Sequence, residues 1–204
     1  MYCLIDFLEI MSNPKISIIV PFHWMANWQF FLTRCLESIE KQTFTDYEVI
    51  LTKAGSMPVN TNRAIQCAKG ELVKVLYMDD AFAHENSLQE ITDNFKEEDI
   101  WMITGCNTNP HPHWTEDIET GNNKLGSPSC LTFRNHFEEN LLFDERMSWM
   151  LDCDLYKRLQ YKYGHPKILD TRNIIIGQGD HQMTHILTDE QKLAEHELMV
   201  NKHK

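Results

Sequence analysis

The residues best suited to chemistry are the adjacent carboxylates Asp79 and Asp80, which directly follow an apolar stretch over 72–77. Two neighbouring carboxylates repel each other unless a positive charge lies close to them. A hard divalent cation bound through oxygen supplies that charge, and the same cation can hold a diphosphate. The alternative is a solvated turn in which one Asp caps the next helix.

A second acidic pair, Asp152 and Asp154, falls in a stretch with helical spacing over 149–163. On a helix, side chains two residues apart point about 160° away from each other, so only one of the two can face a site squarely. Asp154 has Arg158 four residues further on, which predicts a surface ion pair. Asp152 has Tyr156 at that spacing and no basic partner there, so Asp152 is the better candidate for function. The alternative is a solvated Asp at the start of a helix.

His181 and His185 have the i, i+4 spacing of two metal ligands on one helix face. The chain has no H-E-x-x-H motif, so a zinc site is less favoured than a role for His181 as an extra ligand of the metal at Asp79 and Asp80. Among the tryptophans, Trp149 is suited either to stacking on a sugar ring or to packing in the core.

The elements that must position these residues alternate along the first half of the chain. Short apolar runs typical of buried strands alternate with amphipathic stretches typical of helices. This alternation predicts an α/β fold with a mainly parallel central sheet and helices on both faces. Ligands of such sheets bind beyond the carboxyl ends of the strands, so we expect Pro21–Trp24, Lys53–Ser56 and Asp79-Asp80 to converge there. The expected strands are 16–20, 47–51, 72–77 and 100–106, and the expected helices are 28–42, 60–68 and 88–95.

The second half has a less regular pattern. Residues 107–127 are rich in Asn, His, Pro and Gly and predict a long loop. A strand is expected over 130–133 and two short ones over 167–169 and 173–176. Thr188 is suited to capping a last helix, with acidic residues in its first turn and lysines near its end.

The bulk composition narrows the class of protein. A chain of 204 residues with a net charge of −11 fits one soluble domain and argues against a nucleic acid as partner, because that partner requires a basic surface. Six scattered cysteines without a C-x-x-C motif predict free thiols and a cytoplasmic location. No run approaches the about 20 apolar residues that cross a bilayer, so contact with a membrane is expected to be peripheral at most. The sequence leaves the oligomeric state open.

An ordered series of motifs runs along residues 15–100. Each motif is common alone, but the ordered series is specific. A weaker continuation covers Gly126-Ser-Pro-Ser, Phe143-Asp-Glu and the stretch from Trp149 to Leu159. The motifs are Ile16-Ser-Ile-Ile-Val-Pro-Phe, Leu36-Glu-Ser-Ile-Glu-Lys-Gln-Thr-Phe, Asp46-Tyr-Glu-Val-Ile, Gly55-Ser, Asn62 with Ala68-Lys-Gly-Glu-Leu-Val, and Leu76-Tyr-Met-Asp-Asp. In this order they resemble the motifs of family-2 glycosyltransferases.

The resemblance implies the GT-A fold, a nucleoside-diphosphate sugar donor, a Mn²⁺ or Mg²⁺ ion, and transfer with inversion in glycan biosynthesis. The acceptor would be a hydroxyl of a glycan, a lipid-linked molecule or another compound, with Trp149 in its site. By the same resemblance Asp79 binds metal and diphosphate, Asp80 matches the acidic residue that often follows, and Asp152 is the general base. The donor-binding residues it implies are Pro21, Phe22, Lys53, Asn62 and Asp79.

Three residues depart from the family's pattern. Lys53 stands where the family has an Asp against the nucleotide base, Tyr77 replaces the first Asp of Asp-x-Asp, and Leu151 replaces a usual Glu. These changes keep two alternatives open: a degenerate, non-catalytic module that binds a nucleotide sugar or glycan, and a nucleotidyltransferase. Nucleotidyltransferases usually carry a Gly-rich, basic loop after the first strand, and residues 21–27 contain neither Gly nor Arg.

Four segments follow from this interpretation. Residues 1–14 are expected to be an N-terminal extension, with Met11 as an alternative start, and residues 15–106 the nucleotide-sugar-binding half. Residues 107–187 form the acceptor-binding and catalytic half, and 188–204 the C-terminal helix. We expect the 107–127 loop to close over the donor.

Overall fold

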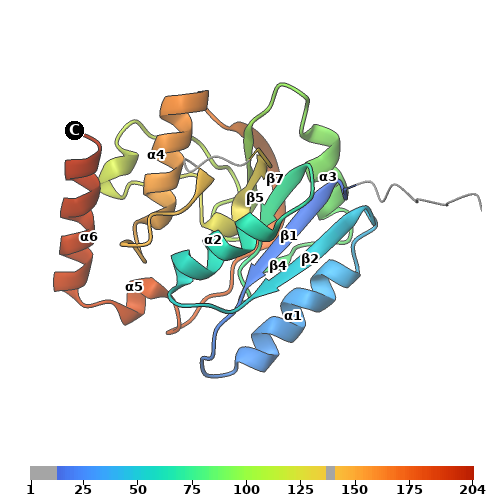
Figure 1. Ribbon diagram of the computed structural model, residues 1–204, viewed down its shortest axis with the longest axis horizontal. Coiled ribbons are helices and arrows are strands. Elements are labelled where there is room, and N and C mark those ends of the chain that lie inside the picture. Colours follow the sequence, from blue (N-terminus) through green and yellow to red (C-terminus); the bar gives the residue numbers. More distant parts are fainter. Residues whose placement is uncertain (1–12, 137–140) are drawn as a thin grey trace, which may run out of the picture.

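The computed structural model describes residues 13–136 and 141–204, so most of the predicted N-terminal extension lies outside the described residues (Figure 1). A seven-stranded sheet runs in the order β2-β1-β3-β6-β5-β7-β4. Its strands are β1 (Ile16–Pro21), β2 (Tyr47–Thr52), β3 (Leu72–Val75), β4 (Ala81–Phe82), β5 (Trp101–Cys106), β6 (Leu131–Arg134) and β7 (Lys167–Ile175). The helices are α1 (Trp28–Glu40), α2 (Met57–Cys67), α3 (Ser87–Asn94), α4 (Leu151–Tyr163), α5 (Met183–Ile186) and α6 (Asp189–Lys202), with 3-10 turns η1 (Ile118–Thr120) and η2 (Pro128–Cys130).

The first three strands form the parallel part of the sheet. β1 lies in the middle, and its residue Ile18 pairs with Val49 of β2 on one side and with Lys74 of β3 on the other. The chain leaves β1 through α1 to reach β2 and returns through α2 to reach β3. Because such crossovers are right-handed, the two helices cover opposite faces, as Figure 1 shows.

The rest of the sheet is mixed, and here the prediction of a mainly parallel sheet is wrong. β6 lies antiparallel between β3 and β5, and β4 pairs antiparallel with β7, whereas β5 and β7 are parallel. The reason is that a short buried run such as Leu131–Arg134 has the same apolar pattern in either direction. The two strands predicted over 167–169 and 173–176 form one strand, β7, whose register shifts opposite Gly105.

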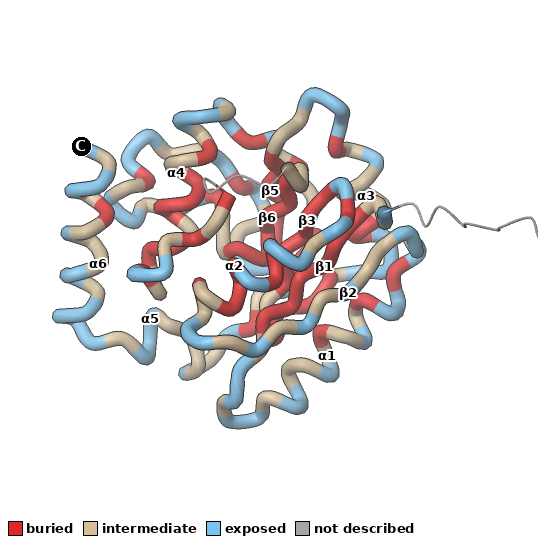
Figure 2. Tube along the Cα trace, in the orientation of Figure 1, coloured by how far each residue is buried: buried red, intermediate tan, exposed pale blue. Residues whose placement is uncertain are grey.

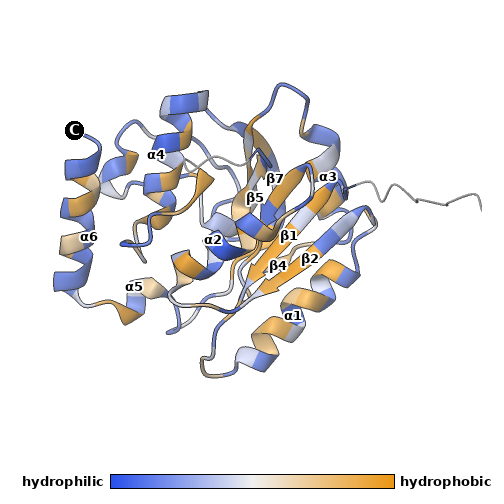
Figure 3. Cartoon of the chain, viewed as in Figure 1, coloured by the Kyte–Doolittle hydropathy of each residue, from blue (hydrophilic) through white to orange (hydrophobic). Residues whose placement is uncertain are grey.

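The core lies along the central strands, which are buried over most of their length (Figure 2), and hydrophobic residues are frequent in them (Figure 3). Trp101 of β5 stacks on Tyr156 of α4 with ring centroids 5.8 Å apart, which fixes α4 against the sheet. Cys35, Cys67, Cys106, Cys130 and Cys153 are free thiols.

The C-terminal helix α6 begins as predicted. Thr188 forms a capping box with Gln191, in which each side chain bonds the other residue's backbone N–H. No helix in the described ranges has the length and apolarity to cross a bilayer. The division into halves at residues 106 and 107 stays a prediction.

Candidate active site

A cavity of about 440 Å³ lies at the carboxyl ends of β1 and β3. This volume falls within the range of cavities that bind small molecules. The predicted convergence of strand ends is confirmed for Pro21, Ser56 and Asp79, which line the same cavity, but Lys53 is not part of the lining. The cavity also brings together residues far apart in the sequence. The predicted site residues in its lining are Pro21, Asp79, Asp80, Trp149, Asp152 and His181.

Asp79 is half-buried at the turn after β3 and contacts the segment after β7. His181 Nε2 lies 3.0 Å from Asp79 Oδ2. The Arg34 guanidinium of α1 donates a hydrogen bond to the Asp79 carbonyl oxygen. A Cβ on Gly177 would lie 2.1 Å from the same oxygen, so only glycine permits this close approach. Sequence reasoning missed Arg34, which lies 45 residues away and has no local motif.

Asp80 is buried beneath Asp79, with 2% of its surface exposed. Burial and the neighbouring Asp79 raise the pKa of Asp80 well above its ordinary value, against the opposing effect of hydrogen bonds from Ser129 and Gly177. Its Oδ1 accepts the Gly177 N–H at 2.8 Å. Within residues 13–136 and 141–204, no group of three or more His, Cys, Asp or Glu side chains is arranged to hold a metal ion. Asp80 bonds the protein backbone, whereas Asp79 and His181 lie side by side, so binding of a metal ion by Asp79, Asp80 and His181 stays a prediction.

The adjacent Asp79 and His181 nonetheless fit a divalent ion that takes its remaining ligands from a substrate. Mg²⁺ and Mn²⁺ are often bound through one or two carboxylates together with phosphate oxygens. Imidazole is an ordinary ligand of transition metals. The His181 ring also packs against Phe31 of α1 at 4.7 Å between centroids, which restricts its orientation.

Asp152 lies in the first turn of α4 and forms part of the cavity wall. Its Oδ2 accepts a hydrogen bond from Asn123 Nδ2 at 2.9 Å, and its Oδ1 accepts the Cys153 N–H at 2.8 Å. Burial raises the pKa of Asp152 to about 6, although these hydrogen bonds act in the opposite direction. A carboxylate with a pKa near the working pH is well suited to general base catalysis.

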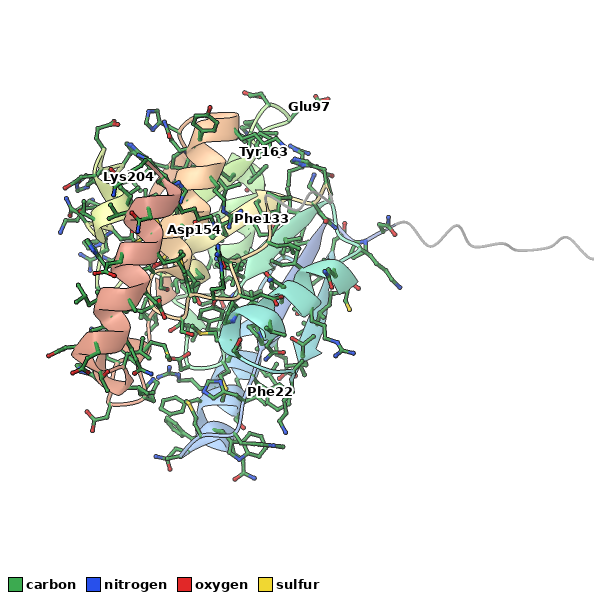
Figure 4. The ribbon with its side chains drawn as sticks, turned by 60° about the vertical axis from the view of Figure 1, so that its left-hand side comes forward. Phe22, Glu97, Phe133, Asp154, Tyr163 and Lys204 are labelled. Atoms are coloured by element: carbon green, nitrogen blue, oxygen red, sulfur yellow. The ribbon has the colours of Figure 1, made fainter. Side chains whose placement is uncertain are left out.

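Asp154 has the opposite environment, where α4 faces α6 (Figure 4). Its carboxylate is completely buried and bonds Arg158, Lys202 and His203 at 2.8–2.9 Å. Burial alone raises the pKa, but His203, Arg158 and Lys202 together lower it to about 2. The predicted pair with Arg158 is confirmed, and the predicted surface exposure is wrong because α6 covers it.

The segment before α4 is held by a carboxylate from α6. Glu195 accepts the backbone N–H groups of Ser148, Trp149 and Met150 at 2.7–3.0 Å. Trp149 is half-buried, packs against the core and also lines the cavity, so both predicted environments apply in part.

Phe22 and Lys53 lie beside the cavity rather than in its lining. Phe22 follows Pro21 and stacks on Trp28 at 6.4 Å between centroids (Figure 4). Lys53 is exposed, with Nζ 3.9 Å from the centre of the Trp24 ring. These residues form a group of aromatic rings and one cation at the ends of β1 and β2, and their contact with a donor stays a prediction.

Asn62 gains no support as a donor-binding residue. It is buried in α2, and its amide bonds the backbone of Phe143 in both directions, at 2.7 and 2.9 Å. The neighbouring Asn60, which sequence reasoning missed, lines the cavity instead. Its amide connects the ends of the first two strands by bonding Phe22 O and the Ala54 N–H.

Tyr77 and Ser127 are among the hydroxyl residues that line the cavity, and neither was predicted as a site residue. Burial raises the pKa of the Tyr77 phenol, so it stays protonated. Ser127 Oγ is buried and has no hydrogen-bond partner among the described residues. A buried hydroxyl at a cavity is available to a ligand.

A second hollow, of about 890 Å³, lies at the opposite, amino ends of β1 and β3, next to Lys15, Lys69 and Glu71. It is larger but contains none of the predicted site residues. Ligands of open α/β sheets bind at the carboxyl ends, so the smaller cavity is the candidate active site.

No protein-family model and no curated protein matches the sequence. Among solved structures, S. aureus TarS 1-349 in complex with UDP-GlcNAc is similar at 16% identity and a TM-score of 0.69, over 91% of this chain and 65% of that one. The same fragment in complex with UDP has 17% identity and a TM-score of 0.59, over 81% and 61%.

The mannosyltransferase PcManGT from Pyrobaculum calidifontis, in complex with GDP-Man and Mn²⁺, has 14% identity and a TM-score of 0.56, over 84% of this chain and 59% of that one. The chain therefore spans less than two thirds of the length of each of these proteins. At this identity the likeness establishes a shared fold.

Proposed function

We propose that this chain is a glycosyltransferase that moves a sugar from a nucleoside diphosphate to an acceptor hydroxyl, with Asp152 as the general base. The observation that carries the proposal is that Asp79 and Asp152, 73 positions apart in the sequence, line one cavity at the carboxyl ends of the strands. The fold is shared with proteins that bind UDP-GlcNAc and GDP-Man. Together with the ordered motifs, this supports a family-2 enzyme of the GT-A class.

On the donor side, Asp79 and His181 would hold the Mn²⁺ or Mg²⁺ ion, whose chemistry is to offset negative charge on a departing diphosphate. Their 3.0 Å contact supports this assignment. Pro21 and Phe22, at the end of β1, would lie against the nucleotide base. Lys53, at the end of β2, would contact the donor nearby.

On the acceptor side, Asp152 takes the proton of the acceptor hydroxyl while that oxygen attacks the anomeric carbon. The bond between this carbon and the diphosphate breaks, and a single displacement of this kind inverts the configuration. With a pKa of about 6, Asp152 is mostly ionised at neutral pH and is still basic enough to accept the proton. Trp149, in the same wall, would stack on the acceptor.

Water must be excluded, because it would otherwise hydrolyse the donor. The Gly177 and His181 contacts with the Asp79-Asp80 turn support a closing role for the segment after β7. The 107–127 loop contributes Ser127 to the cavity wall. The enzyme would act in the cytoplasm, with peripheral access to a lipid-linked acceptor.

A calorimetric titration tests the donor side of this proposal. UDP-GlcNAc and GDP-Man are titrated with and without Mn²⁺ into the wild type, Asp79→Asn and the control Asp170→Asn, whose carboxylate is exposed on β7. We expect Mn²⁺-dependent binding in the wild type and the control, and at least about tenfold weaker binding in Asp79→Asn. Equal affinity in all three proteins would refute the assignment. Release of the nucleoside diphosphate over time separates an enzyme from a non-catalytic binding module.

A further inference from the structure

The 107–127 loop reaches the proposed general base through a single amide. Asn123 Nδ2 donates to Asp152 Oδ2 at 2.9 Å, across 29 positions of sequence. The same nitrogen donates to the Gly126 carbonyl at 3.0 Å. Asn123 is half-buried and lies behind the cavity wall rather than in it.

The other half of the amide fixes its orientation. Asn123 Oδ1 accepts the N–H groups of Leu125 at 2.8 Å and Gly126 at 3.1 Å, so all four hydrogen-bonding positions of the amide are used. Turning the amide over would set its NH₂ group against two backbone donors. The group that faces Asp152 is therefore a donor, and a donor stabilises the ionised carboxylate.

The loop around Asn123 is fastened to the helix that carries Asp152. Tyr156 Oη bonds the carbonyl oxygens of Gly126 and Ser127 at 3.2 and 3.1 Å. Gly126 has a φ of 105°, which other residues rarely adopt, and a Cβ there would lie 3.1 Å from Cys130 Sγ. Loop and helix thus hold the Asn123 amide at a fixed place.

We propose that Asn123 is a positioning residue that holds the Asp152 carboxylate in one orientation and in its ionised form. Asn123 and the Cys153 N–H each bond one oxygen of Asp152, which leaves the remaining lone pairs of the carboxylate for the cavity. The proposal rests on the proposed function of Asp152 as the base.

The other titratable groups around Asp152 do not supply this effect. Cys153 and Tyr156 on α4 and Tyr77 after β3 lie near its carboxylate, and burial raises the pKa of each, so all three are uncharged near neutral pH. The remaining titratable groups of the cavity come from other elements and are unchanged by a substitution at Asn123. They are His23, Asp79, Asp80 and His181.

The test measures the pKa of Asp152 directly, by NMR of ¹³C-labelled Asp carboxyl groups, with the signal assigned from Asp152→Asn. Removing a donor from the ionised form raises the pKa, so Asn123→Ala should move it upward by about one unit from about 6. Asn123→Asp should move it further, because it sets a second carboxyl group beside the first. Asn122→Ala is the matched control, since Asn122 bonds the exposed Asp117 and should leave the value unchanged.

The rate of transfer should follow the same shift. A rise of one unit lowers the rate of Asn123→Ala about fivefold at pH 6 and leaves it near the wild-type rate at pH 8.5. A purely structural loss would lower the rate equally at every pH. If the Ala or Asp variant does not fold, Asn123→Ser keeps a hydroxyl donor and is expected to show a smaller upward shift.

An unchanged Asp152 pKa in the folded variants, or a loss of rate that high pH does not restore, would overturn the proposal for Asn123. A second outcome is that the pKa of Asp152 moves in the variants, but the rate of sugar transfer does not fall at low pH with the titration of Asp152. In that case the role of Asn123 holds and the assignment of Asp152 as the general base fails. The two failures are therefore distinguishable.

Discussion

Asp152 and Asp154 are two positions apart on α4, yet their surroundings give them opposite chemistry. Asp152 faces the cavity, accepts bonds from an amide and a backbone N–H, and has its pKa raised by burial to about 6. Asp154 faces α6 and is held by Arg158, Lys202 and His203, which together bring its pKa to about 2. The first carboxylate can accept a proton near neutral pH, and the second stays ionised and structural.

The buried ion pairs of Asp154 are expected to make part of the free energy of unfolding sensitive to acid. Its pKa is lowered on folding, so its contribution is complete above the unfolded value near 4 and is lost as the pH falls through about 2. The shift corresponds to about 2 kcal/mol. The difference in unfolding free energy between wild type and Asp154→Asn, measured by urea denaturation, should therefore shrink by about 2 kcal/mol between pH 5 and pH 1.5. A difference that does not vary with pH would contradict the buried ion pairs.

Lys53 gives a second prediction at this scale. It stands where the motifs of family-2 glycosyltransferases have an Asp. Its Nζ lies over the Trp24 ring beside the proposed nucleotide site. Lys53→Asp should change the order in which uridine, guanosine, cytidine and thymidine diphosphates bind, as measured by calorimetry. The control is Lys41→Asp, at the exposed end of α1. The same order of affinities in wild type and Lys53→Asp would exclude Lys53 from the site.

At the scale of elements, α6 holds the start of α4 through Glu195. Its carboxylate satisfies three backbone N–H groups that precede the helix, at 148, 149 and 150, and a negative charge is favourable at that end of a helix. This contact fixes the segment that carries Trp149 and leads into Asp152.

Glu195→Ala should therefore lower the free energy of unfolding by about 1.5 to 3 kcal/mol, as measured by thermal or urea unfolding. Glu197→Ala, two positions away and exposed on the same helix, should change it by less than about 0.5 kcal/mol. Equal effects of the two substitutions would show that the contact of Glu195 does not stabilise the fold. Affinity for the donor should be retained in both, since neither residue lines the cavity.

The elements differ in how far the sequence determined them. The helix after Thr188 and the buried strand Ile16–Pro21 follow from capping and from apolar runs, which are local signals. The direction of β6 does not, because burial of Leu131–Arg134 gives the same pattern in a parallel or an antiparallel position. The prediction that Asp154 is exposed was also wrong, because the helix that covers it, α6, begins 35 positions later in the sequence.

At the scale of the molecule, the mixed sheet brings both halves of the chain to one edge. The positions of Pro21, Ser56 and Asp79 after predicted strands indicated that they lie close together, because the carboxyl ends of parallel strands lie at the same edge of a sheet. Three other contacts, each made by a single side chain across a long separation, could not be predicted. These contacts join residues 29 to 47 positions apart and have no sequence motif. They are the contacts of Arg34 with Asp79, of Asn123 with Asp152, and of Glu195 with the segment before α4.

The proposed glycosyl transfer depends most directly on Asp152, and one comparison of variants tests the role of this residue. Release of nucleoside diphosphate from the donor, with Mn²⁺ and a panel of hydroxyl acceptors, is measured for wild type, Asp152→Asn and the control Asp189→Asn, exposed on α6. A positioned base contributes about 10²- to 10⁴-fold, so Asp152→Asn should be at least about a hundredfold slower, with unchanged donor affinity by calorimetry. Asp189→Asn should match the wild type. Wild-type turnover in Asp152→Asn would contradict the assignment of the general base.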